Sequence, residues 1–275
     1  MGTAVIRAAL YQGPGNPGDV SANVAAIAAA AGRAAEAGAD LLVTPEMSAT
    51  GYNIGALSAQ RAEPAGGALF DAVAQIAQSH RIAIVYGYPE AVDGGNYNAV
   101  QVVGPQGEDL ASHRKTHLYG DLDRGLFIEG HTLVSQFEFR GLTCGLAICY
   151  DIEFPEVARA HAVAGTDVLI VPTGLMAPFE VVSKILVPAR AYENQLYVAY
   201  VNRCDVEADL RYCGLTCAIS PDGADIARAD GGEDLLVVDF DPAALATGRA
   251  INTHLPDRRQ DLYGSVSQED SRSIT

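Results

Sequence analysis

The sequence predicts an α/β protein whose helices lie outside its sheets. Apolar stretches of strand length alternate with stretches of helical periodicity in both halves of the chain, and tight glycine- and proline-containing turns add hairpins. Hydrophobic residues make up 49% of the 275 residues, which is enough for a large core. No linker is long enough to separate a second domain, so we expect one domain over residues 1–255 and a polar, extended tail over 256–275.

In the N-terminal half, periodicity and turn residues define the predicted elements. The first helix has apolar residues at helical spacing, Asp19 or Ser21 can cap its start, and Gly38 can end it. Turns at 93–96 and 105–107 separate three hairpin strands. The predicted elements are strand 4–11, helix 20–37, strand 40–44, helix 69–79, and strands 82–88, 97–103 and 108–113.

The C-terminal half continues the alternation. Residues 142–148 are mostly apolar and uncharged, as in a strand buried on both faces, and Pro155 suits the first turn of the helix that follows. Pro188 is expected to kink a later helix. The predicted elements are strand 142–148, a helix from 155, strand 166–171, helix 179–194, strands 196–202, 213–220 and 235–240, and helix 242–248.

Charge and cysteine content exclude several classes of function. The formal net charge of −16 argues against binding to nucleic acid or to an anionic membrane surface, because both attract positive charge. We expect neither a signal peptide over residues 1–9 nor a transmembrane span. The five cysteines are odd in number and form no Cys-x-x-Cys pair, so we expect free thiols and a cytoplasmic location.

Two residue pairs raise the question of a metal site. Cys213 and Cys217 would share one face of a predicted strand, and His113 and His117 lie on either side of Lys115. Neither pair has the further ligands that a zinc site needs. No phosphate-binding glycine motif occurs either, so we expect no metal and no cofactor.

Cys149 lies at a sharp transition from strand to helix. A residue at such a turn is presented above the sheet, and the free backbone N–H groups at the start of the helix favour a thiolate and a developing oxyanion. The cysteine is therefore a candidate nucleophile. A buried structural cysteine that packs as a small apolar residue is the alternative.

Two further polar residues, Glu46 and Lys115, also follow predicted strands. Each alone could be an ordinary surface residue, although lysine occurs only twice in the chain. Together with Cys149 they suit acyl transfer through a thioester, in which a thiol attacks, a carboxylate moves protons and an ammonium stabilises the oxyanion. No histidine is placed to suggest a Cys-His pair.

Three motifs resemble the nitrilase superfamily of carbon–nitrogen hydrolases. They are residues 44–47 with 50–52, residues 114–118, and residues 149–156, in the order and spacing of the family, and the resemblance covers about residues 3 to 255. It implies a four-layer αββα sandwich that often forms a dimer or a larger even homo-oligomer. It also implies that Glu46 is the general base and acid, Lys115 the oxyanion stabiliser and Cys149 the nucleophile, with the backbone N–H of Tyr150 completing the oxyanion hole.

One position departs from the family pattern. Many members have a second glutamate in the loop after the lysine, six residues before a Pro-Gly pair. Here that pair is replaced by Glu129-Gly130, and the matching position is Asp123. Asp123 is the preferred candidate for the second carboxylate and Glu129 is the other.

The residues after Cys149 are more similar to the amidase branches than to nitrilases or to carbamoyl hydrolases. We therefore expect hydrolysis of a small linear carboxamide to its acid and ammonia; a nitrilase, or an N-carbamoyl amidohydrolase, would use the same triad. A non-catalytic binding protein on this scaffold is a remote alternative. Acidic residues at Asp151 and Glu153 would favour substrates with an amine. The candidate substrate-binding residues are Tyr52, Asn53, Glu153, Thr173, Met176 and Phe179.

Overall fold

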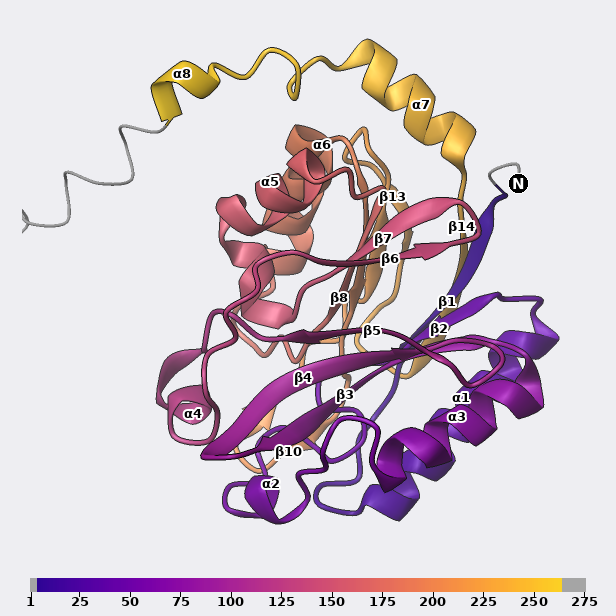
Figure 1. Ribbon diagram of the computed structural model, residues 1–275, viewed down its shortest axis with the longest axis vertical. Coiled ribbons are helices and arrows are strands. Elements are labelled where there is room, and N and C mark those ends of the chain that lie inside the picture. The colour runs from indigo at the N-terminus through magenta and orange to yellow at the C-terminus, as the bar shows by residue number, and fades with distance from the viewer. Residues whose placement is uncertain (1–3, 264–275) are drawn as a thin grey trace, which may run out of the picture.

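The computed structural model, which describes residues 4–263, has four layers (Figure 1). Two six-stranded sheets pack face to face, and helices cover the outer face of each sheet. This arrangement confirms the predicted αββα sandwich. No helix within the described residues is long and apolar enough to cross a membrane.

In the first sheet, three neighbouring strands are parallel, and an antiparallel strand flanks them on each side. Its order is β14 (Asp234–Phe240), β1 (Ile6–Gln12), β2 (Leu41–Val43), β3 (Ala83–Val92), β4 (Gly95–Val103) and β5 (Asp109–Arg114). β1, β2 and β3 are parallel, whereas β4 pairs antiparallel with both β3 and β5. Two reversals make β5 run in the same direction as β2, so both strands end at the same edge of the sheet.

The second sheet has the same plan. Its order is β13 (Asp225–Arg228), β12 (Cys217–Ile219), β9 (Tyr197–Val201), β8 (Val168–Pro172), β7 (Leu142–Leu146) and β6 (Ser135–Phe139). The central strands β7, β8 and β9 are parallel, and the remaining pairs are antiparallel. A small hairpin of β10 (Val206–Glu207) and β11 (Leu210–Arg211) stands apart from both sheets.

Three apolar clusters hold the layers together. The inner faces of the two sheets pack on each other through side chains such as Leu10 and Ile170. The helices α1 (Val20–Glu36) and α3 (Ala68–His80) bury their apolar sides on the first sheet. The helices α5 (Pro155–Val163) and α6 (Val187–Asn194) do the same on the second sheet. Asp19 caps α1 as expected, accepting a hydrogen bond from the backbone N–H of Ala22 at 3.0 Å.

Several predicted boundaries were wrong. The strand predicted over 213–220 is only β12, because Gly214 and Leu215 adopt positive φ angles of 65° and 60°, which interrupt an extended strand. Cys213 therefore does not share a strand face with Cys217. The predicted helix 179–194 begins with a π-helical turn, η2 (Val182–Leu186), and Pro188 lies in the first turn of α6.

Some elements were not predicted from the sequence at all. The edge strands β6 and β13 have mixed polar sequences, because an edge strand need not bury both faces. The short helices α2 (Leu57–Gln60) and α4 (Gly120–Arg124) lie in segments that appear as loops in the sequence.

The C-terminal segment leaves the sandwich after β14. It forms α7 (Pro242–Ile251), whose Arg249 pairs with Asp167 at 2.7 Å, and the short helix α8 (Gln260–Tyr263). The two helices lie along an arc past α5 and α6 (Figure 1). Residues 256–263, the first part of the predicted tail, are exposed or half-exposed. The remainder of that tail, 264–275, lies outside the described residues.

Candidate active site

The predicted triad residues follow three strands that end at one edge of the sandwich. Glu46 follows β2, Lys115 follows β5, and Cys149 follows β7. In α/β sheets the carboxyl ends of parallel strands form the edge at which ligands bind. The fold therefore brings together residues that are far apart in the sequence.

The loop after β2 is held so that Glu46 points inward. Met47 has a positive φ of 52°, and the side chains of Thr44 and Ser48 are hydrogen-bonded at 2.7 Å. The loop passes so close to β3 that a Cβ atom at Gly87 would lie 2.4 Å from the backbone nitrogen of Met47. Only glycine at position 87 leaves room for this path.

Lys115 is completely buried between two carboxylates. Its Nζ atom lies 2.8 Å from Glu46 Oε1 and 2.7 Å from Asp123 Oδ2. Asn98 on β4 also donates a hydrogen bond to Glu46 Oε1, at 2.7 Å. Although burial opposes a positive charge, the neighbouring negative charges hold the pKa of Lys115 well above its ordinary value. The residue is therefore an ammonium cation fixed in place.

The second carboxylate in contact with this lysine is Asp123. Its two oxygens accept hydrogen bonds from the Tyr52 hydroxyl at 2.7 Å and from the Tyr119 backbone N–H at 2.9 Å, besides the contact with Lys115. Glu129 makes no hydrogen bond or ion pair with any residue in the range 4–263. The shorter side chain reaches the lysine because α4, which contains Asp123, begins only five residues after Lys115.

Glu46 keeps one oxygen free for chemistry. Its Oε2 atom is buried and has no hydrogen-bond partner among the described residues. A Cβ atom at Gly174 would lie 3.1 Å from this oxygen, so Oε2 faces the segment that follows β8. Burial raises the pKa of Glu46, and the charge of Asp123 adds to this effect, while Lys115 and Asn98 oppose it. A carboxylate with a raised pKa is a better proton acceptor than an ordinary glutamate.

Cys149 begins a single 3₁₀ turn, η1 (Cys149–Glu153), and has a positive φ of 47°. Such a backbone conformation is uncommon outside glycine and recurs at functional sites. The expectation of a favoured thiolate was wrong for the resting protein. Burial and the charge of Glu46 raise the pKa of the Cys149 thiol, although Lys115 and hydrogen bonds from Thr173 and Gly174 act in the opposite direction. The thiol therefore needs a base.

Asp151 is a structural residue and does not make the pocket acidic as the sequence suggested. It is buried, and it accepts hydrogen bonds from the backbone N–H groups of Ile148, Thr116 and His117 at 3.0, 3.2 and 2.9 Å. Burial would raise the pKa of Asp151, but hydrogen bonds from the side chains of His113, His117 and Thr116 hold it well below the usual range. Asp151 thus ties the segment after Lys115 to the segment that presents Cys149.

A cavity of about 210 Å³ opens onto the nucleophile. Its lining is mostly aromatic and apolar, with one carboxylate, and consists of Tyr52, Tyr119, Cys149, Tyr150, Glu153, Gly174, Leu175, Met176 and Phe179. The predicted pocket residues Tyr52, Glu153, Met176 and Phe179 are among them. Its size suits a small organic molecule.

Two predicted substrate-binding residues lie elsewhere. Asn53 does not line the cavity, because its backbone N–H binds Glu207 at 2.6 Å and its side chain binds Asp209 at 2.9 Å. Thr173 does not line the cavity, and its hydroxyl is hydrogen-bonded to the Tyr200 hydroxyl at 3.0 Å and lies within hydrogen-bond reach of Cys149. Both residues support the site from outside the cavity.

Three residues of the site, Asn98, Tyr119 and Glu207, were not identified from the sequence. Asn98 lies within the predicted strand 97–103. A polar side chain on a buried strand is a signal that could have identified it as a site residue. The buried Glu207 binds the backbone N–H of Tyr52 at 3.1 Å and the Tyr212 hydroxyl at 2.7 Å, so it holds one wall of the cavity. It lies in the short β10 strand, which has no clear sequence pattern.

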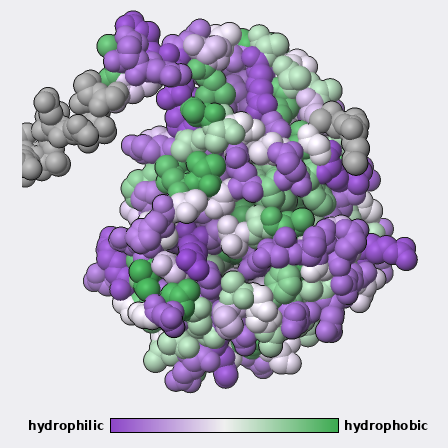
Figure 2. All heavy atoms as spheres, in the orientation of Figure 1, coloured by the Kyte–Doolittle hydropathy of each residue, from purple (hydrophilic) through white to green (hydrophobic). Residues whose placement is uncertain are grey.

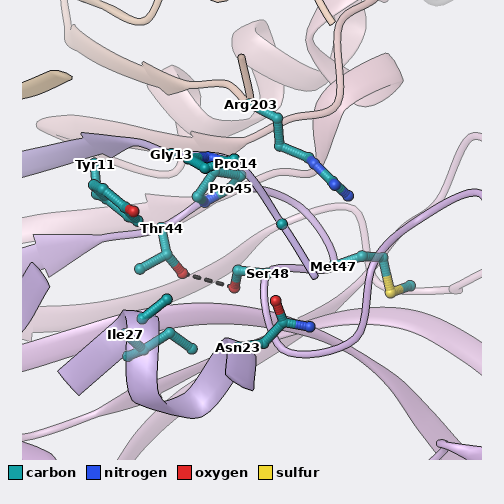
Figure 3. A pocket seen from close by; sticks show the side chains of 12 residues that line it. Tyr11, Gly13, Pro14, Asn23, Ile27, Thr44, Pro45, Met47, Ser48 and Arg203 are labelled. Carbon is teal, nitrogen blue, oxygen red and sulfur yellow. Dashed lines mark hydrogen bonds between the residues drawn. The ribbon is translucent and has the colours of Figure 1, made fainter. Parts of the chain in front are cut away.

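A second hollow lies behind the Glu46 loop (Figure 3). Tyr11, Asn23, Ile27 and Arg203 surround it together with the backbone of the loop, and its volume is only about 20 Å³. That is room for about one water molecule. The hollow is too small for an organic substrate. The cavity described above is the candidate site because Cys149 lines it.

Within residues 4–263 no group of three or more histidine, cysteine, aspartate or glutamate side chains is arranged to hold a metal ion. The positive charge beside the nucleophile is that of Lys115.

The chain matches a protein-family profile and individual known proteins over most of its length. The sequence profile described as carbon-nitrogen hydrolase matches residues 7–250. The chain is 46% identical to a hydrolase from the pqqF 5′ region of Pseudomonas protegens, over 97% of this chain and 94% of that protein. It is 37% identical to an (R)-stereoselective amidase from a Pseudomonas species, over 94% of this chain and 93% of that protein.

Solved structures of an amidase from Nesterenkonia sp. AN1 are similar in fold. A double mutant in complex with acrylamide has a TM-score of 0.86 and 33% identity, covering 95% of this chain and 97% of the amidase. A mutant in complex with butyramide has a TM-score of 0.85 and 34% identity, covering 94% and 96%. In a further mutant, the acetamide moiety of fluoroacetamide is attached covalently to the active-site cysteine of that amidase.

Proposed function

The chain belongs to the carbon–nitrogen hydrolase family as an amidase-type enzyme, and we propose that Cys149, Glu46 and Lys115 perform its chemistry. The reaction is hydrolysis of a small linear carboxamide to the carboxylic acid and ammonia. One observation carries this assignment: a buried ammonium group lies between two carboxylates, one of which has a free oxygen, beside the cysteine that lines the cavity.

The first half of the reaction forms a thioester. Glu46 removes the proton from the Cys149 thiol as the sulfur attacks the amide carbon. The negative charge that develops on the carbonyl oxygen is stabilised by Lys115 and by the backbone N–H of Tyr150. Glu46 then gives its proton to the leaving nitrogen, and the C–N bond breaks to release ammonia.

The second half regenerates the enzyme. Glu46 removes a proton from a water molecule, which attacks the thioester carbon, and the same two groups stabilise the second oxyanion. The C–S bond breaks and the proton returns to sulfur, leaving the free acid. Throughout, Asp123 acts as a positioning residue, because it holds Lys115 at 2.7 Å.

The cavity restricts the acyl group to a small one. Its volume of about 210 Å³ is below the usual range for drug-sized ligands. Complexes of the Nesterenkonia amidase with acrylamide and butyramide are consistent with this size class.

We also propose that the protein is a cytoplasmic homodimer or larger even oligomer. Val163, Val181 and Ile185, on or beside α5 and α6, are each at least half exposed. Figure 2 shows hydrophobic side chains among hydrophilic ones over this region. Contact between two copies would remove this apolar surface from water. The five free cysteines are consistent with a reducing compartment. Light scattering of wild type and of Ile185→Glu tests the oligomer: the variant should have the lower mass.

Ammonia release from a panel of substrates tests the function. We expect release from small amides such as butyramide, and loss of release in Cys149→Ala. Cys204→Ala, at a half-buried cysteine outside the cavity, is the matched control. Release from nitriles or N-carbamoyl compounds but not from amides would overturn the substrate class. If no compound reacts and Cys149 also resists alkylation, the scaffold would be a binding protein.

A further inference from the structure

The cavity contains one ionisable carboxylate that the proposed reaction does not use. Glu153 is the last residue of η1, one turn beyond Cys149, and its side chain is half-buried. It lines the same cavity as the nucleophile. With the 3₁₀ rise of about 2 Å per residue, its backbone lies about 8 Å along the turn from Cys149.

The Glu153 carboxylate makes no ion pair or hydrogen bond with any residue among those described. The nearby guanidinium of Arg190 is directed elsewhere: its Nε donates to the Ile152 carbonyl at 3.0 Å and its Nη2 to the Glu153 backbone carbonyl at 2.8 Å. Its Nη1 pairs with Glu193 at 3.0 Å. Arg190 therefore fixes the backbone at Glu153 and leaves the carboxylate available.

Aromatic rings complete the surroundings of this carboxylate. Tyr119 contacts Tyr150 edge-on with ring centroids 5.4 Å apart and lies 6.3 Å from the ring of Phe179. All three line the cavity with Glu153. The charge of Glu153 also raises the pKa of Tyr119, after the larger effect of burial. Aromatic faces and a carboxylate together form an environment that attracts an organic ammonium group.

We propose that Glu153 selects carboxamides that carry an ammonium group, so that the enzyme prefers ω-amino amides over neutral and anionic amides of the same size. This inference rests on the amidase function proposed above. The amide carbon lies at Cys149 and the ammonium group lies at Glu153, with a short methylene chain between them. The buried charges behind Cys149 reinforce the preference, because two carboxylates there contact a single lysine.

Three amides of similar size test the inference through kcat/KM measured as ammonia release. β-Alaninamide is cationic, butyramide is its neutral counterpart, and succinamate is anionic. Wild type should prefer β-alaninamide over butyramide by about ten- to a hundredfold, the range of one charge-assisted contact. Succinamate should be the poorest substrate.

The variant Glu153→Gln removes the charge with little change of shape. The preference for β-alaninamide over butyramide should fall to about one, and succinamate should gain relative to butyramide. Glu156→Gln, at an exposed glutamate three residues further on and outside the cavity, should keep the wild-type ratios.

The outcomes separate the two proposals. Equal rates for all three amides in wild type would overturn the role of Glu153 and leave the amidase function intact, without reliance on any variant. A preference that survives in Glu153→Gln would place the cation elsewhere and also overturn the inference. Failure of every amide would contradict the proposed function, and the inference with it.

Discussion

The two ends of the substrate cavity are built differently. Behind the inner end, next to Cys149, Glu46, Lys115 and Asp123 are completely buried and do not line the cavity, and both carboxylates contact the lysine at less than 3 Å. At the outer end, Glu153 and Phe179 lie on a 3₁₀ turn and a loop and are partly exposed, and the Glu153 carboxylate has no hydrogen bond or ion pair among the residues described. The inner end is fixed before substrate arrives, whereas the outer end is left to interact with it.

This difference follows from the cost of burying charge. Three ionised groups away from water are stable only when each has a partner in good geometry. Two strand ends of the first sheet, after β2 and β5, and the short helix α4 provide that geometry here. The outer end needs no such support, because its groups remain in contact with solvent. We therefore expect substitutions at the inner end to affect kcat, and often stability, and substitutions at the outer end to affect substrate preference.

The largest effect among the supporting groups is expected for Glu46→Gln. The amide keeps the shape of the side chain but cannot accept a proton from the thiol, so kcat/KM should fall by about 10² to 10⁴. Steady-state ammonia release measures this, with the exposed Glu36→Gln on α1 as the control. A loss of less than fivefold would assign the base to another residue.

Lys115→Met should lower both activity and stability. Loss of the oxyanion donor should reduce kcat by about 10² to 10³. Two buried carboxylates would also lose their shared counterion, which costs about 3–5 kcal/mol in the free energy of unfolding. Lys184→Met is the matched control, because Lys184 is exposed and is the only other lysine. Denaturant unfolding that does not distinguish the two variants would contradict the buried cluster.

Asp123→Asn should have a smaller effect on rate and a defined effect on pH dependence. Burial raises the pKa of Glu46 and the negative charge of Asp123 raises it further. Activity requires ionised Glu46, so kcat/KM should fall as the pH drops through a pKa above the ordinary glutamate value. Removing the charge at Asp123 should move this acid limb to lower pH.

The control for that shift is the second candidate carboxylate. Glu129→Gln should leave the acid limb of the pH profile where it is in wild type, because the Glu129 side chain makes no hydrogen bond or ion pair with Lys115. If Glu129→Gln shifts the limb and Asp123→Asn does not, the positioning role belongs to Glu129.

The smallest effect is expected at the outer end, for Phe179→Ala. The ring is 42% exposed at the cavity and packs edge-on against Tyr119. Its loss should raise KM for β-alaninamide a few-fold, with little change in kcat, because a cation–π contact at an exposed site is worth about 0.5–1 kcal/mol. A large drop in kcat would show that the outer end also takes part in the chemistry.

The same division explains how far the sequence could predict the molecule. Glu46 and Cys149 follow buried apolar strands, and Lys115 follows the polar edge strand β5 but is one of only two lysines. The residue pattern alone therefore indicated all three as candidates. Asn53 was predicted to line the pocket because it lies on a loop beside a strand end, but its direction depends on Glu207 and Asp209, more than 150 positions away in the chain. Asp151 was misjudged for the same reason, since its partners follow a different strand.

Loop and edge segments were the least predictable parts of the fold. β6 and β13 pair on one side only, so their sequences need not be apolar throughout. The predicted strand 213–220 does not begin at residue 213, because Gly214 and Leu215 have positive φ angles. Glycine adopts such angles readily and leucine does not, so only Gly214 indicates the break from its residue type. Contacts between distant segments, rather than local pattern, decide these features.

The most direct test of the account is the mass of the protein during turnover. Wild type mixed with butyramide and quenched in acid should show a fraction of molecules heavier by one butyryl group, and peptide mapping should place that group on Cys149. Cys149→Ala should show neither the adduct nor ammonia release. Continued release of ammonia from Cys149→Ala, or an acyl group on another residue, would contradict the thioester mechanism.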